Sequence, residues 1–170
     1  MQEQELRTLN YYDGISKGYK ELYWSEQTNK IEKIKLHLIK SGVALDCGSG
    51  DGVLNRYFDN KTKLISADIS FRLLKLNSNK SKVNCSITNL PFKDKSFDQI
   101  ICLSVIQDVD DISNSISELS RILKNESSLI LSHIKISSKQ DKIKESLDNY
   151  FSILEIIEEE KDIIYLCSNR

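Results

Sequence analysis

Apolar residues in this chain fall into two kinds of pattern, a helical spacing and short continuous runs. Between residues 26 and 41 the side chains of Ile31, Ile34 and Leu38 recur at helical spacing, which predicts a helix that Gly42 ends. The next segment, residues 43–47, is almost continuously apolar, as expected of a buried strand. A helix followed by a strand is therefore the first unit that the pattern predicts.

The same alternation continues along the chain. Strands that alternate with helices form a parallel sheet with helices on both faces. The pattern therefore predicts an α/β, Rossmann-like fold in three layers. Strands are predicted over residues 64–68, 83–88, 97–103 and 129–133, and helices over 70–77 and 111–124.

The C-terminal part departs from an all-parallel sheet. After a predicted helix over residues 138–147, two β-rich runs, 150–157 and 163–167, flank the charged spacer 158–162, which is typical of a hairpin turn. The expected fold is an αβα sandwich whose mostly parallel seven-stranded sheet ends in an antiparallel β-hairpin. No repeat or low-complexity linker interrupts the chain, which indicates one domain.

Composition indicates the number of domains, the cellular location and the state of the cysteines. The chain has 170 residues, 39% hydrophobic and 29% charged, which suits one globular domain. Residues 1–8 are polar, and no apolar run reaches the roughly 20 residues that cross a bilayer, so we expect a cytoplasmic protein. Four scattered cysteines without a CxxC pair favour buried free thiols over a zinc site or a disulfide. They are Cys47, Cys85, Cys102 and Cys167.

The formal net charge of −1 argues against binding dominated by nucleic-acid electrostatics. Lysines nevertheless cluster, and either solvated faces or a strip that faces tRNA or rRNA would account for them. The clusters are Lys61/Lys63, Lys75/Lys80/Lys82, Lys93/Lys95 and Lys139/Lys142/Lys144.

The segment with most chemical information is a glycine-rich turn that follows the first predicted strand. Gly48 and Gly50, with Ser49 between them, allow a tight turn and a close approach to a ligand, and their amides are expected to point outward. Asp68 ends the next strand about 20 residues downstream, where a carboxylate accepts the hydroxyls of an adenosine ribose. The arrangement therefore predicts a site for an adenosine-containing cofactor.

Two ligands match this arrangement, a nicotinamide dinucleotide and S-adenosylmethionine. Val53 stands at the last glycine position of the dinucleotide pattern, and Asp46 would place negative charge beside a diphosphate. The same charge suits the cationic sulfonium and ammonium of S-adenosylmethionine, and Asp46 is also expected to hold the amides of the turn. The pattern thus favours S-adenosylmethionine over the cofactor of an oxidoreductase.

Several segments resemble the motifs of class I S-adenosylmethionine-dependent methyltransferases, most closely the branch with the ubiquinone and menaquinone biosynthesis enzymes. The segments are residues 43–52, Ala67-Asp68-Ile69-Ser70, Leu90-Pro91-Phe92 with Ser96-Phe97-Asp98, and Arg121-Ile122-Leu123-Lys124. The resemblance implies S-adenosyl-L-methionine as cofactor. The residues expected to contact it in these motifs are Asp46, Gly48, Ser49, Gly50, Asp68, Ile69 and Leu103.

The resemblance extends to residues 11–19, which look like the family's cofactor-covering segment. It implies a helical lid over residues 1–24 and a methyltransferase domain over residues 25–170. Tyr19, and also Tyr12, would then contact the methionine end of the cofactor. Alternatively, these aromatic residues only anchor an N-terminal helix.

Two departures from the family concern the adenine and acceptor ends. Where the family has an acidic residue that binds the adenine amino group, this chain has Ser86, a weaker acceptor than a carboxylate. The backbone of Ile87 is expected to read the adenine edge. After Leu103-Ser104, residues 105–108 replace the family's Leu-His-His segment.

Methyl transfer is an in-line displacement, so the protein mainly aligns the acceptor and excludes water. If the acceptor must lose a proton, His133 at the end of the fifth strand and Asp108 beyond the fourth are the candidate bases. His133 is equally well explained as a residue that makes a local hydrogen bond.

The acceptor cannot be read from these motifs. No Asn-Pro-Pro-Tyr or Asp-Pro-Pro-Tyr follows the fourth strand, which argues against methylation of an exocyclic base amine. The small platform favours a small acceptor, with tRNA wobble positions and protein side chains as alternatives. The resemblance also implies a zinc-binding activator protein as a partner for the edge strand at residues 83–88. The alternative function is a non-catalytic cofactor-binding or scaffolding subunit, motivated by Ser86 and by residues 107–108.

Overall fold

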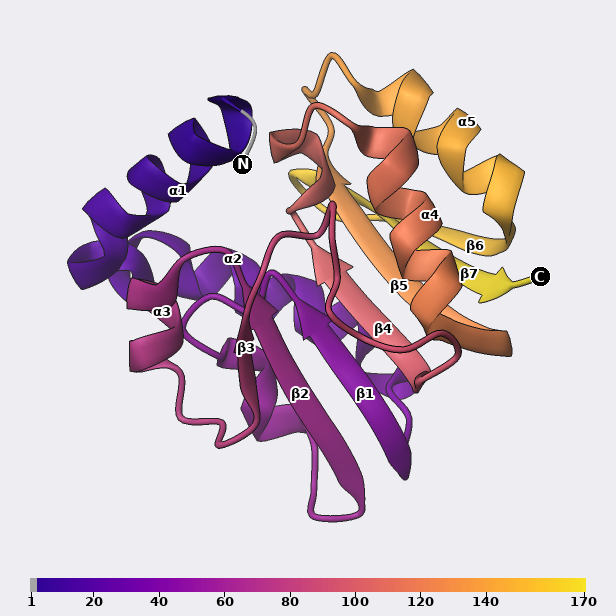
Figure 1. The fold of residues 1–170 in the computed structure, drawn as a ribbon, viewed down its shortest axis with the longest axis horizontal. Coiled ribbons are helices and arrows are strands. Elements are labelled where there is room, and N and C mark those ends of the chain that lie inside the picture. Colours follow the sequence, from indigo (N-terminus) through magenta and orange to yellow (C-terminus); the bar gives the residue numbers. More distant parts are fainter. Residues whose placement is uncertain (1–2) are drawn as a thin grey trace.

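The computed structural model describes residues 3–170, which form a seven-stranded sheet with helices on both faces (Figure 1). The strand order is β3-β2-β1-β4-β5-β7-β6, and only the pairs that include β7 are antiparallel. This topology confirms the predicted fold, including the C-terminal hairpin. The strands are β1 (Gly42–Cys47), β2 (Thr62–Asp68), β3 (Lys82–Asn84), β4 (Phe97–Leu103), β5 (Leu123–Ile134), β6 (Phe151–Glu158) and β7 (Asp162–Asn169).

Two apolar cores hold the layers together. On one face, Ile116 of α4 and Leu147 of α5 are fully buried against the sheet, and on the other face Ile31 and Ile34 of α2 are fully buried. Each such side chain contributes about 1.5–3 kcal/mol on burial, so these faces form a rigid base for the strand ends. The helices are α1 (Glu3–Ile15), α2 (Tyr19–Ile34), α3 (Phe71–Leu76), α4 (Ile112–Ile122) and α5 (Gln140–Tyr150).

The helix before β1 differs from its prediction. It begins at Tyr19 rather than at residue 26, and it ends at Ile34, where a 3₁₀ helix over Lys35–His37 replaces the last predicted turn. Gly42 starts β1 with φ of +103° instead of ending the helix. A Cβ there would lie 2.7 Å from Oδ2 of Asp98, so the close approach of that carboxylate explains the glycine.

The strand predicted over residues 83–88 is much shorter, because β3 ends at Asn84. The side-chain amide of Asn84 donates to the carbonyls of Asp68 (2.9 Å) and Ile69 (2.8 Å). Beyond it the chain turns, and the Ser86 hydroxyl accepts the amide of Thr88 at 3.2 Å. After Asn84, local hydrogen bonds from side chains thus replace the hydrogen bonds between strands. β3 lies at the edge of the sheet, as predicted.

The N-terminal segment lies beyond the carboxyl ends of the strands (Figure 1). Helix α1 contacts α3 on one side and the 3₁₀ helix Ile106–Asp108 on the other. The predicted boundary between residues 24 and 25 falls inside α2, so α1 with the turn over Ser16–Gly18 is the part that stands apart from the core. The first two residues of the predicted lid, 1–2, lie outside the described residues.

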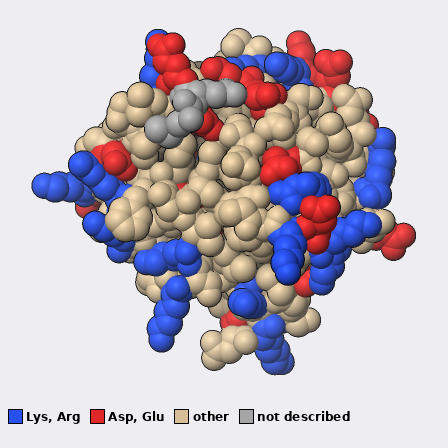
Figure 2. All heavy atoms as spheres, in the orientation of Figure 1, with Lys and Arg blue, Asp and Glu red and all other residues tan. Residues whose placement is uncertain are grey.

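Surface charge is mixed. On the face drawn in Figure 2, lysine and arginine side chains lie at the left and right edges, in the lower half and right of the centre, where acidic side chains stand among them. The lysine clusters of the sequence therefore do not join into a continuous basic strip on this face. Within residues 3–170, no helix is both long and apolar enough to cross a membrane.

Candidate functional site

A cavity of about 590 Å³ lies at the carboxyl ends of β1, β2 and β4, under α1 and α2. Ligands of α/β sheets bind in this place, and the volume is typical of a small-molecule site. Most of the residues predicted for the site line this cavity. They are Tyr19, Asp46, Gly48, Ser49, Asp68, Ile69, Ser86, Ile87, Leu103 and Asp108.

The turn at residues 48–50 requires glycine at two positions, but its backbone amides donate to groups of the protein rather than toward a ligand. Gly48 and Gly50 have φ of +82° and +52°, and a Cβ on Gly48 would lie 2.1 Å from Val105. The amides of Gly48 and Ser49 both donate to the carbonyl of Ala67, at 2.8 and 3.0 Å. The expectation of outward donors is therefore wrong, and a phosphate would find few free amides here.

Asp68 has the turn-holding role that was predicted for Asp46. Its two carboxylate oxygens accept the amides of Gly50 and Ser70, each at 2.8 Å. Burial raises the pKa of Asp68 to about 6, although the two amides oppose the shift. Each oxygen keeps a second acceptor position, so Asp68 still offers acceptors to the cavity.

Asp46 is a buried carboxylate that faces the cavity with 7% of its surface exposed. Within residues 3–170 its carboxylate makes no hydrogen bond, and burial, followed by the negative charge of Asp68, raises its pKa to about 8. An ionised carboxylate is costly to bury without a partner. A cationic group in the cavity would supply that partner.

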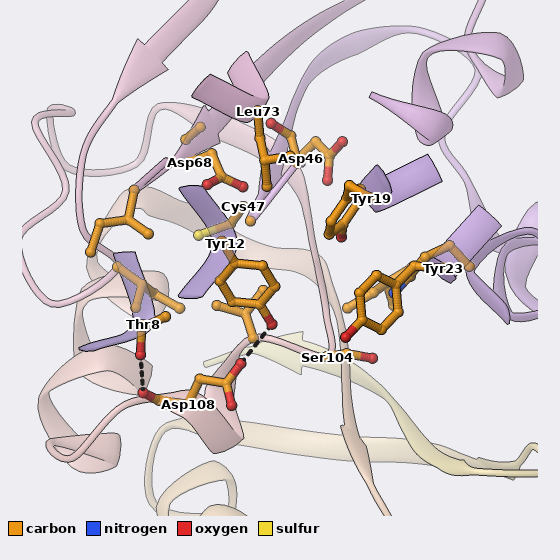
Figure 3. Close-up of a pocket in the computed structure, with 18 of the residues that line it drawn as sticks. Thr8, Tyr12, Tyr19, Tyr23, Asp46, Cys47, Asp68, Leu73, Ser104 and Asp108 are labelled. Atoms are coloured by element: carbon orange, nitrogen blue, oxygen red, sulfur yellow. Dashed lines mark hydrogen bonds between the residues drawn. The ribbon is translucent and has the colours of Figure 1, made fainter. Parts of the chain in front are cut away.

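Tyrosine rings from the N-terminal segment form one wall of the cavity, as Figure 3 shows. The ring of Tyr19 lies 5.1 Å from that of Tyr23 and 6.2 Å from that of Tyr12, between centroids. The hydroxyl of Tyr19 approaches Gly50 closely enough that a Cβ there would lie 3.1 Å from it. Burial raises the pKa of Tyr12 and of Tyr19, so both remain neutral hydroxyls.

Asp108 is joined to α1 at another part of the cavity (Figure 3). The hydroxyl of Tyr12 donates to Oδ2 of Asp108 at 2.9 Å, and that of Thr8 donates to its backbone carbonyl at 3.2 Å. Burial raises the pKa of Asp108, while the Tyr12 hydrogen bond and the charge of Lys139 lower it. A carboxyl group with a raised pKa beside a cavity is suited to exchange a proton.

His133 does not reach the cavity. Its ring is fully buried, lies against Tyr165 with 5.7 Å between centroids, and has Nδ1 2.9 Å from the carbonyl oxygen of Ile134. The local hydrogen bond is the alternative that the sequence left open, and this geometry gives His133 no access to an acceptor in the cavity. Gly50 also lies outside the lining, and its amide donates to Asp68.

One polar group that the sequence did not suggest lines the cavity, and a second lies behind its wall. Glu5 of α1 is buried in the cavity wall and accepts the hydroxyls of Ser86 and Thr88. Lys30 of α2 is fully buried behind the cavity, where it pairs with Asp162 at 3.0 Å and donates to the hydroxyl of Ser104, a lining residue. The spacing of Glu5, Thr8 and Tyr12, at i, i+3 and i+7 on one helix face, is the signal that could have identified Glu5.

The comparisons with known proteins agree with this geometry. The family described as "Methyltransferase domain" matches residues 45–131. An uncharacterized protein of Methanocaldococcus jannaschii is 39% identical over 118 residues, 67% of this chain and 49% of that protein. A demethylmenaquinone methyltransferase of Tropheryma whipplei is 33% identical over 87 residues, 47% of this chain and 36% of that protein. The chain spans about half the length of the first of these relatives and less of the second.

A solved structure shares the fold along the whole chain. Magnesium protoporphyrin IX methyltransferase of Synechocystis PCC 6803, crystallised with bound S-adenosylmethionine, superimposes with a TM-score of 0.82 at 17% identity. The match covers 100% of this chain and 99% of that chain.

Proposed function

Since this chain belongs to the methyltransferase-domain family and has the fold of class I S-adenosylmethionine-dependent methyltransferases, we propose that it transfers a methyl group from S-adenosylmethionine to a small acceptor. The observation that carries the proposal is Asp46, a buried carboxylate that lacks a partner within residues 3–170 and faces the cavity. A cofactor with a fixed ammonium and a sulfonium is the ligand class that this charge suits.

The residues present fit the parts of the cofactor. Asp46 would accept the ammonium, and the free acceptor positions of Asp68 would accept the ribose hydroxyls. Ile69, Ser86 and Ile87 line the part beyond Asp68, where the adenine would lie. Leu103 and Tyr19 would enclose the methionine end. The inward amides of the turn support this ligand over a dinucleotide, because no phosphate needs them.

When bound, the cofactor supplies an electrophilic methyl group on sulfur. The chain's own part is to align an acceptor and to exclude water, and α1 is placed to do both because it covers the cavity. Where the acceptor atom carries a proton, Asp108 would take it, and the Tyr12 hydroxyl would hold that carboxylate in place.

Three finer assignments concern the branch of the family, a partner protein and the location in the cell. The 33% identity to a demethylmenaquinone methyltransferase supports the ubiquinone and menaquinone branch, and we propose a small ring-bearing acceptor beside the tyrosine wall. An activator protein would need β3, an edge of only Lys82–Asn84. The cytoplasmic location is likewise a proposal, supported by cysteines that are all free thiols.

The test is transfer of a labelled methyl group from S-adenosylmethionine to three pools, namely small molecules, tRNA and proteins of a cell extract. We expect label in the small-molecule pool and its loss in Asp46→Asn. Asp59→Asn is the matched control, because Asp59 is exposed near the start of β2, at the opposite end of the sheet. Calorimetry with S-adenosylhomocysteine completes the test: no binding would refute the proposal, and binding without transfer to any pool would favour the non-catalytic alternative.

A further inference from the structure

Four tyrosines, which we call the tyrosine cluster, line the cavity on the side of Asp108. Their ring centroids lie 5.1 Å apart for Tyr11 and Tyr12, 6.2 Å for Tyr12 and Tyr19, and 5.1 Å for Tyr19 and Tyr23. The hydroxyls of Tyr11 and Tyr23 lie 2.8 Å apart, which closes the cluster. Because the faces of such rings attract cations, this wall is suited to a positively charged group.

Asp108 is a carboxylate beside the tyrosine cluster, and no basic side chain within residues 3–170 forms an ion pair with it. The basic groups nearby are engaged elsewhere. Lys161 pairs with Glu26 at 3.1 Å, and Lys139 donates to two backbone carbonyls at 3.0 and 2.7 Å. A ligand that brings a positive charge to Asp108 would supply the missing partner, whereas a carboxylate or a phosphate would be repelled.

The methyl donor does not account for this second carboxylate. In the proposed function its ammonium is accepted by Asp46, which belongs to β1, whereas Asp108 follows β4 and is hydrogen-bonded to Tyr12 (Figure 3). The cavity therefore has one carboxylate without an ion pair for the donor and another for the acceptor. Aromatic rings combined with a carboxylate are the surroundings in which proteins hold methylated ammonium groups.

We propose that the methyl acceptor is a basic amine, whose nitrogen lies between the carboxylate of Asp108 and the rings of Tyr12 and Tyr23. This inference rests on the proposed function and names the atom that is methylated. A carboxylate or phosphate acceptor is disfavoured at this place because its charge has the same sign as that of Asp108.

The chemistry of the transfer agrees with these surroundings. The amine nitrogen gives its lone pair to the methyl carbon, the carbon–sulfur bond breaks, and its electron pair stays on sulfur. The positive charge thus passes to the nitrogen of the product, where Asp108 and the rings stabilise it as it develops. A nitrogen that still carries a proton passes it to the Asp108 carboxylate.

The experiment compares two probes of the same shape, choline and its uncharged isostere 3,3-dimethylbutan-1-ol. Both are titrated by calorimetry into protein saturated with S-adenosylhomocysteine, so that the ammonium of that ligand already occupies the place of the donor's. We expect the wild type to favour choline by about tenfold or more. Asp108→Asn and Tyr23→Leu should each reduce this preference several-fold.

Two matched variants are the controls. Tyr23→Phe keeps the ring and should keep the preference, and so should Asp110→Asn, because Asp110 is exposed two positions away and does not line the cavity. Equal affinity of the wild type for both probes, or no binding of choline, would overturn the inference. A preference that Asp108→Asn leaves unchanged would do the same.

The labelled small-molecule pool of a cell extract provides a second measurement. We expect the label in products that a cation exchanger retains and that withstand mild alkali, as N-methylated amines do. Label in unretained or alkali-labile products would overturn the inference and leave the proposed function intact. Absence of transfer, or of S-adenosylhomocysteine binding, would refute the proposed function and this inference with it.

Discussion

The ionisation of Asp46 makes cofactor affinity depend on pH in a direction that the structure fixes. In the unliganded protein burial raises the pKa of Asp46 to about 8, so this group is mostly protonated at neutral pH. Accepting the ammonium of S-adenosylhomocysteine requires the ionised form. Affinity should therefore rise with pH until the pKa is passed and then level off.

The expected magnitude follows from the same pKa. With a value of about 8, roughly one Asp46 in a hundred is ionised at pH 6 and about half at pH 8, so the dissociation constant should fall about 50-fold over this interval. Asp68, with a pKa of about 6, adds about a factor of two at the low end. Asp46→Asn should bind more weakly at pH 8 and lose nearly all of the dependence.

The assay is calorimetric titration with S-adenosylhomocysteine at several pH values for the wild type, Asp46→Asn and the control Asp59→Asn. Stability provides a second measurement. Because the folded pKa of Asp46 lies above its unfolded value of about 3.9, its contribution to stability is present at low pH and is lost as pH rises toward 8. Unliganded Asp46→Asn should therefore melt above the wild type at pH 8. A flat affinity profile in the wild type would refute the reasoning.

Three further predictions concern the segments around the cavity. Tyr12→Phe removes a hydrogen bond that lowers the pKa of Asp108, so the acidic limb of the kcat profile should move to higher pH, and an unmoved limb would argue against Asp108 as the base. Deleting residues 1–18 should leave a folded core that binds S-adenosylhomocysteine more weakly, as titration of the truncated protein would show; unchanged affinity would argue against a lid. Lys30→Met leaves Asp162 as a buried unpaired charge and should lower the free energy of unfolding by about 3–5 kcal/mol in urea denaturation, whereas Lys30→Met with Asp162→Asn should recover much of the loss.

Much of the fold could be predicted because apolar periodicity records which faces are buried. The run at residues 97–103 became β4 with the same bounds, since it packs on both sides of the sheet. The start of α2 could not be found in the same way. Tyr19 and Tyr23 face a cavity rather than a core, so the first turns of this helix carry no apolar period. Apolar periodicity marks side chains that are buried in a core, so it does not reveal a helix turn whose side chains line a ligand cavity.

The motifs predicted which segments form the site, but they did not predict which of its residues holds the glycine turn and which is left to bind a ligand. Asp46 and Asp68 are both carboxylates near the glycine turn, and which of them receives its amides depends on the path of the loop, which the sequence does not specify. The contact of Glu5 with Ser86 joins positions 81 residues apart, a distance that local spacing cannot bridge. Similarly, a lysine such as Lys30 is usually found on the surface, and its burial is explained by its ion pairs with Asp162 across the fold and with Glu26 one turn earlier.

The way α1 is held indicates which part of the protein opens. Within Glu3–Ile15 the buried residue is Glu5, whereas α4 buries several apolar side chains, among them Ile116 and Leu119. Hydrogen bonds to charged groups, such as those that hold α1, contribute about 1.5–3 kcal/mol each. Helix α4 adds the burial of Ile112, Ile116, Leu119 and Ile122 to its own hydrogen bonds, and each of these side chains contributes about 1.5–3 kcal/mol. We therefore expect α1 to open while the core stays folded. Because the same helix carries Glu5 to Ser86 and Tyr12 to Asp108, closure of α1 over a bound cofactor would form both contacts together, so that the acceptor side is completed only after the methyl donor is in place.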